Sequence, residues 1–276
     1  MQVFHFGIFI PMFFIIPLCN AQYWSPQGSR SIALGGSSVT LNDEWAVHNN
    51  PAGMALSQGS SVAASYENNF FTGNLGYRSI AATFTRNSGA FGLRALQTGD
   101  KYLNYLLTGV AYARKLGQDF SAGVQLNAAR TSIGEGYGTK YLATFELGIL
   151  FKLQNKLVFG AHLFNPILTR LSTFADERLP ALMEAGLCYS YSENFLAIAQ
   201  VRKQTNHPLE YLGGLEYRIL KLNAVRVGFS TNPFRYTFGY GLHINQLTFD
   251  VGSSYHSALG FSASASCQYS FGSRKL

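Results

Sequence analysis

Charge is scarce in this 276-residue chain, because Lys, Arg, Asp and Glu make up only 13% of it, against about 25% in ordinary soluble domains. Hydrophobic residues make up 47%, which is too much for a disordered chain. Long apolar runs are also missing: after residue 21, no stretch approaches the roughly 20 apolar residues that a membrane helix needs. These deficits exclude intrinsic disorder and a bundle of membrane helices.

What the chain has instead is alternation, together with 28 Gly, 16 Tyr and 22 Phe. In the segment 234–244 every second residue is a large apolar one, and the residues between are polar or small. The apolar set is Phe234, Tyr236, Phe238, Tyr240, Leu242 and Ile244. A period of two is typical of a β-strand with one apolar face. Segments 181–192, 247–256 and 259–271 repeat the pattern.

Applied to the whole chain, the alternation predicts fourteen strands. They are 59–66, 74–86, 90–97, 104–115, 119–132, 139–153, 156–164, 181–192, 194–203, 209–220, 223–231, 234–244, 247–256 and 259–271. We therefore predict an all-β fold, a 14-stranded antiparallel transmembrane β-barrel over residues 59–276 with an N-terminal plug. An even strand count is typical of bacterial outer-membrane barrels. A soluble β-sandwich is the alternative, but its water-exposed face should carry more charge.

Two kinds of connection alternate along the predicted strands. Tight turns lie at 87–89, 117–118, 154–155 and 245–246, whereas longer loops lie at 67–73, 98–103, 133–138 and 165–180. Short turns belong on the periplasmic side of such barrels and long loops outside. We therefore expect both ends of the barrel domain in the periplasm.

Residues 1–21 resemble a secretory signal peptide, because an apolar core precedes Cys19-Asn20-Ala21 with small residues at the cleavage positions. An uncleaved membrane anchor is the alternative, which Pro11 and Pro17 disfavour by shortening a helix. The sequence thus predicts export to the bacterial outer membrane.

Residues 22–58 do not alternate, and we expect them to form a plug, or hatch, inside the barrel. Fourteen strands enclose a lumen too wide for their own side chains to fill. A flexible periplasmic tail is the alternative. The expected hatch motif is Asn49, Asn50, Pro51, Ala52 and Gly53, with Pro51 fixing its own φ and Gly53 permitting a tight turn against the wall.

Several motifs resemble those of the FadL-type outer-membrane transporters, and more closely their PorV/PorQ branch. They are Ser29 to Val39, Asp43 to Ala46, Asn49 to Gly53, Gly160 to Pro166, Arg178 to Pro180 and Glu184 to Tyr189. The FadL resemblance implies passage or binding of small hydrophobic compounds. The PorV/PorQ resemblance implies, as the alternative, a structural or shuttle component of type IX secretion with secretion-machinery proteins as partners.

Charged side chains that share the non-apolar face of their strands should point into the lumen, because a charge facing lipid costs about 2–4 kcal/mol near the midplane. The predicted lumen polar network comprises Arg94, Glu146, Glu184, Glu216, Arg218, Arg226, Arg235, His243 and Asp250. Both signs occur on adjacent strands, which favours a structural salt-bridge network over a translocation path.

The sequence contains no catalytic, metal-binding or cofactor motif, so we expect a protein that is not an enzyme and has no cofactor or metal. The 21 basic residues exceed the 14 acidic ones, but they are scattered rather than clustered. This pattern favours contact with outer-membrane lipid over nucleic acid.

The longest loop, 165–180, is bracketed by Pro166 and Pro180 and is rich in apolar residues. The spacing of Ile167, Leu168 and Leu171, extended by Phe174, predicts a short helix folded over or into the barrel mouth. Leu168, Leu171 and Phe174 are the candidate contacts for a ligand or partner; a lid that binds no ligand is the alternative.

Overall fold

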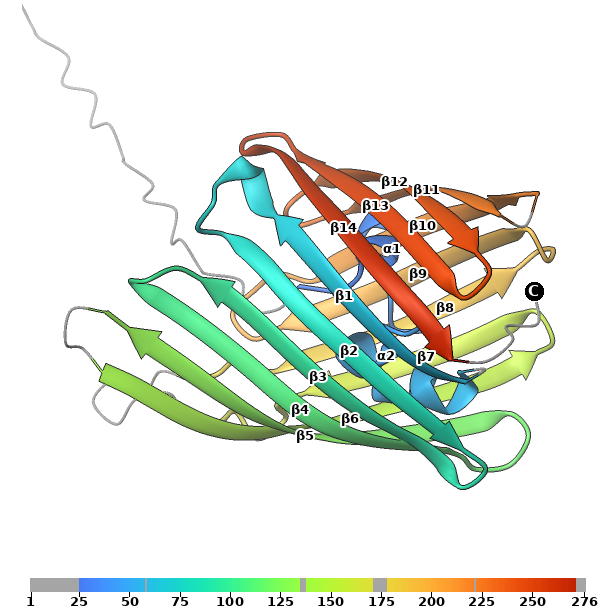
Figure 1. Cartoon of the computed structure of the whole chain (residues 1–276), viewed down its shortest axis with the longest axis horizontal. Coiled ribbons are helices and arrows are strands. Elements are labelled where there is room, and N and C mark those ends of the chain that lie inside the picture. The colour runs from blue at the N-terminus through green and yellow to red at the C-terminus, as the bar shows by residue number, and fades with distance from the viewer. Residues whose placement is uncertain (1–24, 58, 135–137, 171–177, 221, 272–276) are drawn as a thin grey trace, which may run out of the picture.

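The computed structural model describes residues 25–57, 59–134, 138–170, 178–220 and 222–271. Fourteen antiparallel strands form a closed barrel in which each strand pairs with its sequence neighbours and β1 pairs with β14 (Figure 1). The strands are β1 Ser60–Asn68, β2 Gly76–Arg86, β3 Gly89–Gly99, β4 Leu103–Lys115, β5 Phe120–Ile133, β6 Gly138–Gln154, β7 Leu157–Phe164, β8 Leu182–Ser190, β9 Phe195–Gln204, β10 Glu210–Ile219, β11 Asn223–Ser230, β12 Arg235–Ile244, β13 Leu247–His256 and β14 Gly260–Phe271. The prediction of a closed fourteen-strand barrel is confirmed.

The barrel wall has two contrasting faces because successive strand residues point to opposite sides. Large apolar side chains such as Leu126 and Phe238 are exposed on the outer face. The inner face carries buried polar, small and charged residues, including Gln125, Thr237 and Glu146. An outer face made of large apolar side chains is typical of a barrel set in a bilayer, where lipid covers that face.

The two ends of the barrel differ in their connections. The short-turn end holds 87–88, 155–156 and 245–246, and both ends of the barrel domain meet there, where β1 begins and β14 ends. The long-loop end holds 165–181 and also a 3₁₀ turn, η2 Asn69–Phe71. Among the described residues no helix is both long and apolar enough to cross a membrane.

The N-terminal segment, described from residue 25 to residue 57, is drawn within the barrel (Figure 1). It contains α1 Ser29–Ala33, α2 Ala46–Asn49 and a 3₁₀ helix, η1 Pro51–Leu56. Helix α1 packs against β11 to β14, and η1 packs against β2 to β6. Ser25 Oγ donates to Glu67 Oε2 (3.3 Å) near the long-loop end of β1. Because residue 57 lies next to the start of β1, the segment runs along the lumen from the long-loop half to the short-turn end.

Glycines on the inner face allow this segment to approach the wall. At nine of them, each on a different strand, a Cβ would lie 3.0 Å or less from an atom of the N-terminal segment, at or below the lower limit of real Cβ contacts. They are Gly92, Gly123, Gly148, Gly160, Gly186, Gly214, Gly228, Gly239 and Gly252. This glycine girdle explains much of the high glycine content: only a residue without a side chain leaves room for a second layer of backbone.

Candidate functional site: the lumen

A charge belt crosses the inner face of the barrel. It alternates acidic and basic side chains from β3 through β6, β7, β8, β9 and β10 to β12, and each member is joined to the next by an ion pair. In order, the belt is Arg94, Glu146, His162, Glu184, Arg202, Glu210 and Arg235. A buried charge is stable only when it is paired. Each ion pair of the belt therefore holds the strands that carry its two members in a fixed arrangement.

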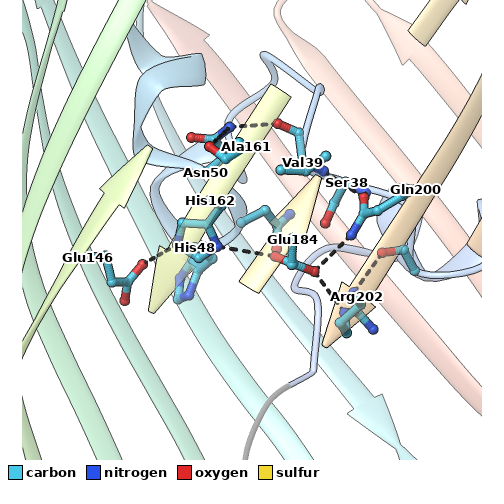
Figure 2. A network of polar contacts seen from close by, with 12 residues as sticks. Ser38, Val39, His48, Asn50, Glu146, Ala161, His162, Glu184, Gln200 and Arg202 are labelled. Carbon is cyan, nitrogen blue, oxygen red and sulfur yellow. Dashed lines mark hydrogen bonds and ion pairs between the residues drawn. The ribbon is translucent and has the colours of Figure 1, made fainter. Parts of the chain in front are cut away.

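His162 sits at the centre of the belt between two carboxylates (Figure 2). Its Nε2 lies 2.9 Å from Glu146 Oε2, and its Nδ1 lies 3.1 Å from Glu184 Oε2. Both ring nitrogens can donate at once only when the imidazole is protonated. The imidazolium therefore separates two carboxylates that would otherwise repel each other.

A second charged cluster joins the N-terminal segment to β10, β11 and β13. Arg30 donates two hydrogen bonds to Glu216, of 2.7 and 2.9 Å, and one of 3.2 Å to Asp43. Arg226 also donates to Glu216 (2.7 Å) and to Asp250 (2.7 Å). Helix α1 is thus tied to β10, β11 and β13 through charge-assisted hydrogen bonds, which are stronger than neutral ones.

Side chains of the barrel wall also form hydrogen bonds with backbone groups of the N-terminal segment. Gln200 Oε1 accepts from the amides of Ser38 (2.8 Å) and Val39 (3.0 Å), and Figure 2 shows this contact beside the belt. Arg94 Nη1 donates to the carbonyl oxygen of His48 (3.2 Å). The His48 side chain itself is buried, and burial together with the nearby Arg94 lowers the pKa of His48 to about 3, so this imidazole is neutral.

The predicted hatch motif lies where the segment meets β5, β6 and β7. Asn49 binds the backbone of Gln27 through its side-chain amide. Asn50 caps η1, since its Oδ1 accepts from the Ala52 amide (3.1 Å). Pro51 begins η1 and Gly53 lies within it, so the expected tight turn is a turn of 3₁₀ helix. A Cβ at Gly53 would lie 2.5 Å from the Leu41 carbonyl oxygen, which explains the need for glycine there.

Asn50 is expected to hold the segment to the wall. Its Nδ2 donates to Val39 O (2.6 Å) and lies 3.3 Å from Ile149 O and 3.4 Å from Ala161 O. Asn50→Leu leaves these carbonyls without the amide, at a cost of about 1–3 kcal/mol. We expect amide hydrogen exchange in residues 38–53 to accelerate accordingly, with β12 to β14 unchanged. Equal exchange in the wild type and the variant would contradict this role.

The structure places the members of the predicted polar network in two groups. Arg94, Glu146 and Glu184 belong to the belt, as does Arg235, which pairs with Glu210 and is partly exposed. Glu216, Arg226 and Asp250 belong to the Arg30 cluster, and Arg218 contacts Glu216 at 3.3 Å with its side chain 45% exposed. His243 Nδ1 lies 3.0 Å from Thr248 Oγ1 on the neighbouring strand.

Some residues of these groups were not among the predicted network residues. His162 has the same parity on its strand as Gly160 and Phe164, so parity could have placed it on the inner face. Its two carboxylate partners lie on other strands. Arg30 lies outside the alternating region, where parity gives no direction. Among the described residues, no group of His, Cys, Asp and Glu is arranged to hold a metal ion.

An apolar cluster, called the apolar wall below, packs together on the inner side of the barrel at the long-loop end. Its residues lie at the long-loop ends of β3 to β8 and in the loop before β8, all of them buried. They are Leu96, Tyr105, Leu107, Ala129, Leu142, Phe164, Leu179 and Leu182. The candidate contacts named from the sequence at this end are loop residues, whereas strand residues form most of the apolar wall and the described loop residues contribute Leu179.

The described part of the 165–180 loop is not helical. Asn165 and Leu168 both have positive φ, of 48° and 51°, and the Leu168 amide donates to Asn165 O (3.1 Å) in a turn. Asn165 Nδ2 donates to Leu179 O (2.6 Å), which pins the end of the loop to its start. Leu168 is half-buried, while Leu171 and Phe174 lie outside the described residues.

The fold of this closed fourteen-strand barrel is similar to that of several solved channel structures, among them FadL-type ones. The toluene transporter TbuX of Ralstonia pickettii has a TM-score of 0.73 and 13% identity, covering 90% of this chain and 99% of its own. The toluene transporter TodX of P. putida scores 0.72 with 12% identity, over 91% and 100%. A Pseudomonas aeruginosa FadL homologue scores 0.65 with 14% identity, over 90% and 98%.

The likeness to FadL-type channels is therefore confirmed at the level of the fold, which is what identities this low establish. No protein-family model matches the sequence, and no curated protein matches it.

Proposed function

We propose that this barrel passes small hydrophobic compounds across the bacterial outer membrane. The observation that carries the proposal is the apolar wall, because a lumen that conducts ions or sugars is lined by polar groups. Apolar surface at the long-loop end would take up an apolar solute from outside and release it from water. The gain comes from the solute itself, at roughly 25 cal/mol for each Å² of its apolar surface that leaves water.

Three further features complete the proposal. Residues 1–21 act as a signal peptide for export, residues 22–58 act as a hatch that closes the lumen, and residues 59–276 form the channel domain. Contacts from the glycine girdle and the Arg30 cluster support the hatch. The solved structures of similar fold support transport, since their names describe hydrocarbon channels and toluene transporters. The alternative role in type IX secretion is supported by none of these observations, and we do not propose it.

Leu142 tests the proposal, as a buried member of the apolar wall on β6. Leu142→Gln places an amide in this wall at a cost of about 1–3 kcal/mol, and we expect toluene uptake by cells that express the barrel to fall about tenfold. Leu142→Met, which conserves volume and polarity, is the control and should transport normally. Heat-modifiable migration on a gel verifies that both variants fold. If Leu142→Gln transports toluene as well as the control does, the apolar wall is not on the path.

A further inference from the structure

Charge on the two faces of the strands is segregated by sign. All carboxylates on the described strands lie on the inner face and are buried. They are Glu67, Glu146, Glu184, Glu210, Glu216 and Asp250. The strand cations with outward parity, by contrast, are Arg78, Arg86, Arg114, Arg130 and Lys203. On the described strands the outer face thus presents cations without carboxylates, and such a face attracts the phosphate groups of lipid headgroups.

Two of these cations, Arg78 and Arg130, belong to one row of directly opposed residues on the outer face near the long-loop end. The row crosses β1 to β6, which are neighbours in the barrel (Figure 1). In order, it consists of Tyr66, Arg78, Gln97, Leu106, Arg130 and Tyr141, and we call it the arginine row. Because neighbouring strands are spaced about 4.8 Å apart, the backbones of the two arginines lie roughly 14 Å from each other.

The outer face changes from apolar to polar at the arginine row. Two residues closer to the short-turn end, the outward residues are mostly small and apolar: Ala64, Ile80, Ala95, Thr108, Ala128 and Ala143. Two residues closer to the long loops, they are Gly99, Asn104, Ser132 and Thr139. The apolar band of a membrane barrel ends in a girdle of aromatic residues at the interface, and Tyr66 and Tyr141 fit this place. The guanidinium groups of the row therefore lie at the depth of the lipid headgroups.

Within the part of the chain that the structure describes, neither arginine of the row has an anionic partner. Arg130 Nε has no hydrogen-bond acceptor, and Asn104 Oδ1, diagonal to it on β4, has no donor. Arg78 is exposed, with its guanidinium carbon 5.8 Å from the centroid of the Tyr66 ring. Asp100, in the loop beyond the row, accepts hydrogen bonds from two nearby backbone amides. Buried polar atoms without partners call for an explanation, and a ligand with phosphate oxygens and hydroxyl groups would supply both kinds of partner.

Strands β11 to β14 meet the headgroups differently. Their directly opposed outward residues at the long-loop end are Phe229, Tyr236, Tyr255 and Phe261. Aromatic side chains of this kind sit at the headgroup level of a membrane without a need for charge. Lys203, the remaining outward cation of the described strands at this end, donates from its Nζ to the His207 carbonyl oxygen (2.5 Å). The unpaired charge is thus concentrated on β2 and β5, which general contact with lipid does not require.

We propose that the arginine row binds the phosphorylated sugar headgroup of a glycolipid in the outer leaflet. A planar guanidinium matches the geometry of a phosphate, so Arg78 and Arg130 bind the phosphate groups, while Asn104 Oδ1 accepts from a sugar hydroxyl. The small side chains beneath the row, such as Ala95 and Ala128, let acyl chains lie close to the wall. This site goes beyond the proposed function, because it lies on the lipid side of the wall and not on the path of a solute.

The test compares two forms of one lipid on the full-length barrel. Lipid A, a bisphosphorylated glycolipid, is the probe, and the same lipid without its phosphates is the comparison. Native mass spectrometry of the intact barrel in detergent micelles measures the binding of each. We expect the wild type to bind lipid A at least tenfold more tightly than the dephosphorylated lipid. The double variant Arg78→Gln with Arg130→Gln should bind both lipids alike, because glutamine is polar but carries no charge.

The double variant Arg86→Gln with Arg114→Gln is the matched control, since it removes outward cations near the short-turn end, outside the row. It should keep the wild-type preference, and heat-modifiable migration verifies that both double variants fold. Inorganic phosphate at millimolar concentration should leave lipid A bound, because the lipid and not free phosphate occupies the row. The proposal is overturned if the wild type binds both lipids equally, if the first double variant keeps the preference, if the control loses it, or if inorganic phosphate displaces lipid A. Toluene uptake is a separate measurement, so either proposal can fail alone.

Discussion

Replacing Gly228 with Val is expected to open the lumen, so that a barrel whose lumen is blocked by the N-terminal segment conducts ions. A Cβ at this position on β11 would lie 2.3 Å from the Gly35 amide nitrogen and 2.5 Å from the Leu34 carbonyl carbon. Both are backbone atoms of the N-terminal segment, so no side-chain rotation relieves the clash. Valine suits a strand better than glycine does, so the barrel tolerates the change while the segment is displaced.

Single-channel recording in a planar bilayer measures the result. We expect a severalfold rise in conductance, and deletion of residues 22–58 should give a similar open state. Gly73→Val is the matched control, because no atom lies within 4 Å of a Cβ built there, and its conductance should equal that of the wild type. If Gly228→Val migrates as a folded barrel and remains closed, the N-terminal segment does not close the lumen.

Glu146→Gln is expected to destabilise the barrel by about 3–5 kcal/mol, the usual cost of breaking a buried ion pair by removing one partner. Glu146 is fully buried and binds Arg94 and His162 at once, while Asn127 Nδ2 also donates to it (2.9 Å). Glutamine preserves the shape of the side chain and one acceptor oxygen. What it removes is the negative charge between two positive side chains.

Urea unfolding of the barrel in lipid vesicles, followed by tryptophan fluorescence, gives the free energy of unfolding. Glu193→Gln serves as the control, since Glu193 is exposed in the β8–β9 turn and surface changes of this kind stay within about 0.5 kcal/mol. Equal unfolding curves for the two variants would mean that the belt contributes little to stability.

The barrel was predictable because its signal is local. Alternation over 234–244 and its counterparts placed every strand within two residues of its observed bounds, since side-chain direction in a strand depends only on parity. Parity also placed Glu146 and Arg226 on the inner face. For Arg226 the adjacent strand also indicated its partner, Glu216. Parity did not reveal the partners of Glu146, because Arg94 lies three strands away and strand register decides which charges meet.

Other features of the lumen depend on contacts that the sequence does not encode locally. The glycine count was evident, but the purpose of Gly148 or Gly228 depends on a segment about 100 to 200 positions earlier in the chain. Leu107 and Leu142 were on the inner face by the same parity that placed the charges. Parity does not show that they meet in one apolar cluster, because contacts between strands decide which inward side chains touch. The sequence of residues 25–57 has no hydrophobic period, so its path through the barrel could not be predicted from the pattern.

The contacts between the N-terminal segment and β14 have a consequence for the order in which the barrel folds. The Ser29 amide donates to Ser266 Oγ on the last strand, across 237 positions of the chain, and Ser270 Oγ donates to Glu44 (3.1 Å). Contacts this distant form late, because they require the loop between them to close. The first described residues of the chain therefore gain their full set of partners only when β14 joins β1. We therefore expect these contacts to form together with the β1–β14 pairing that closes the barrel.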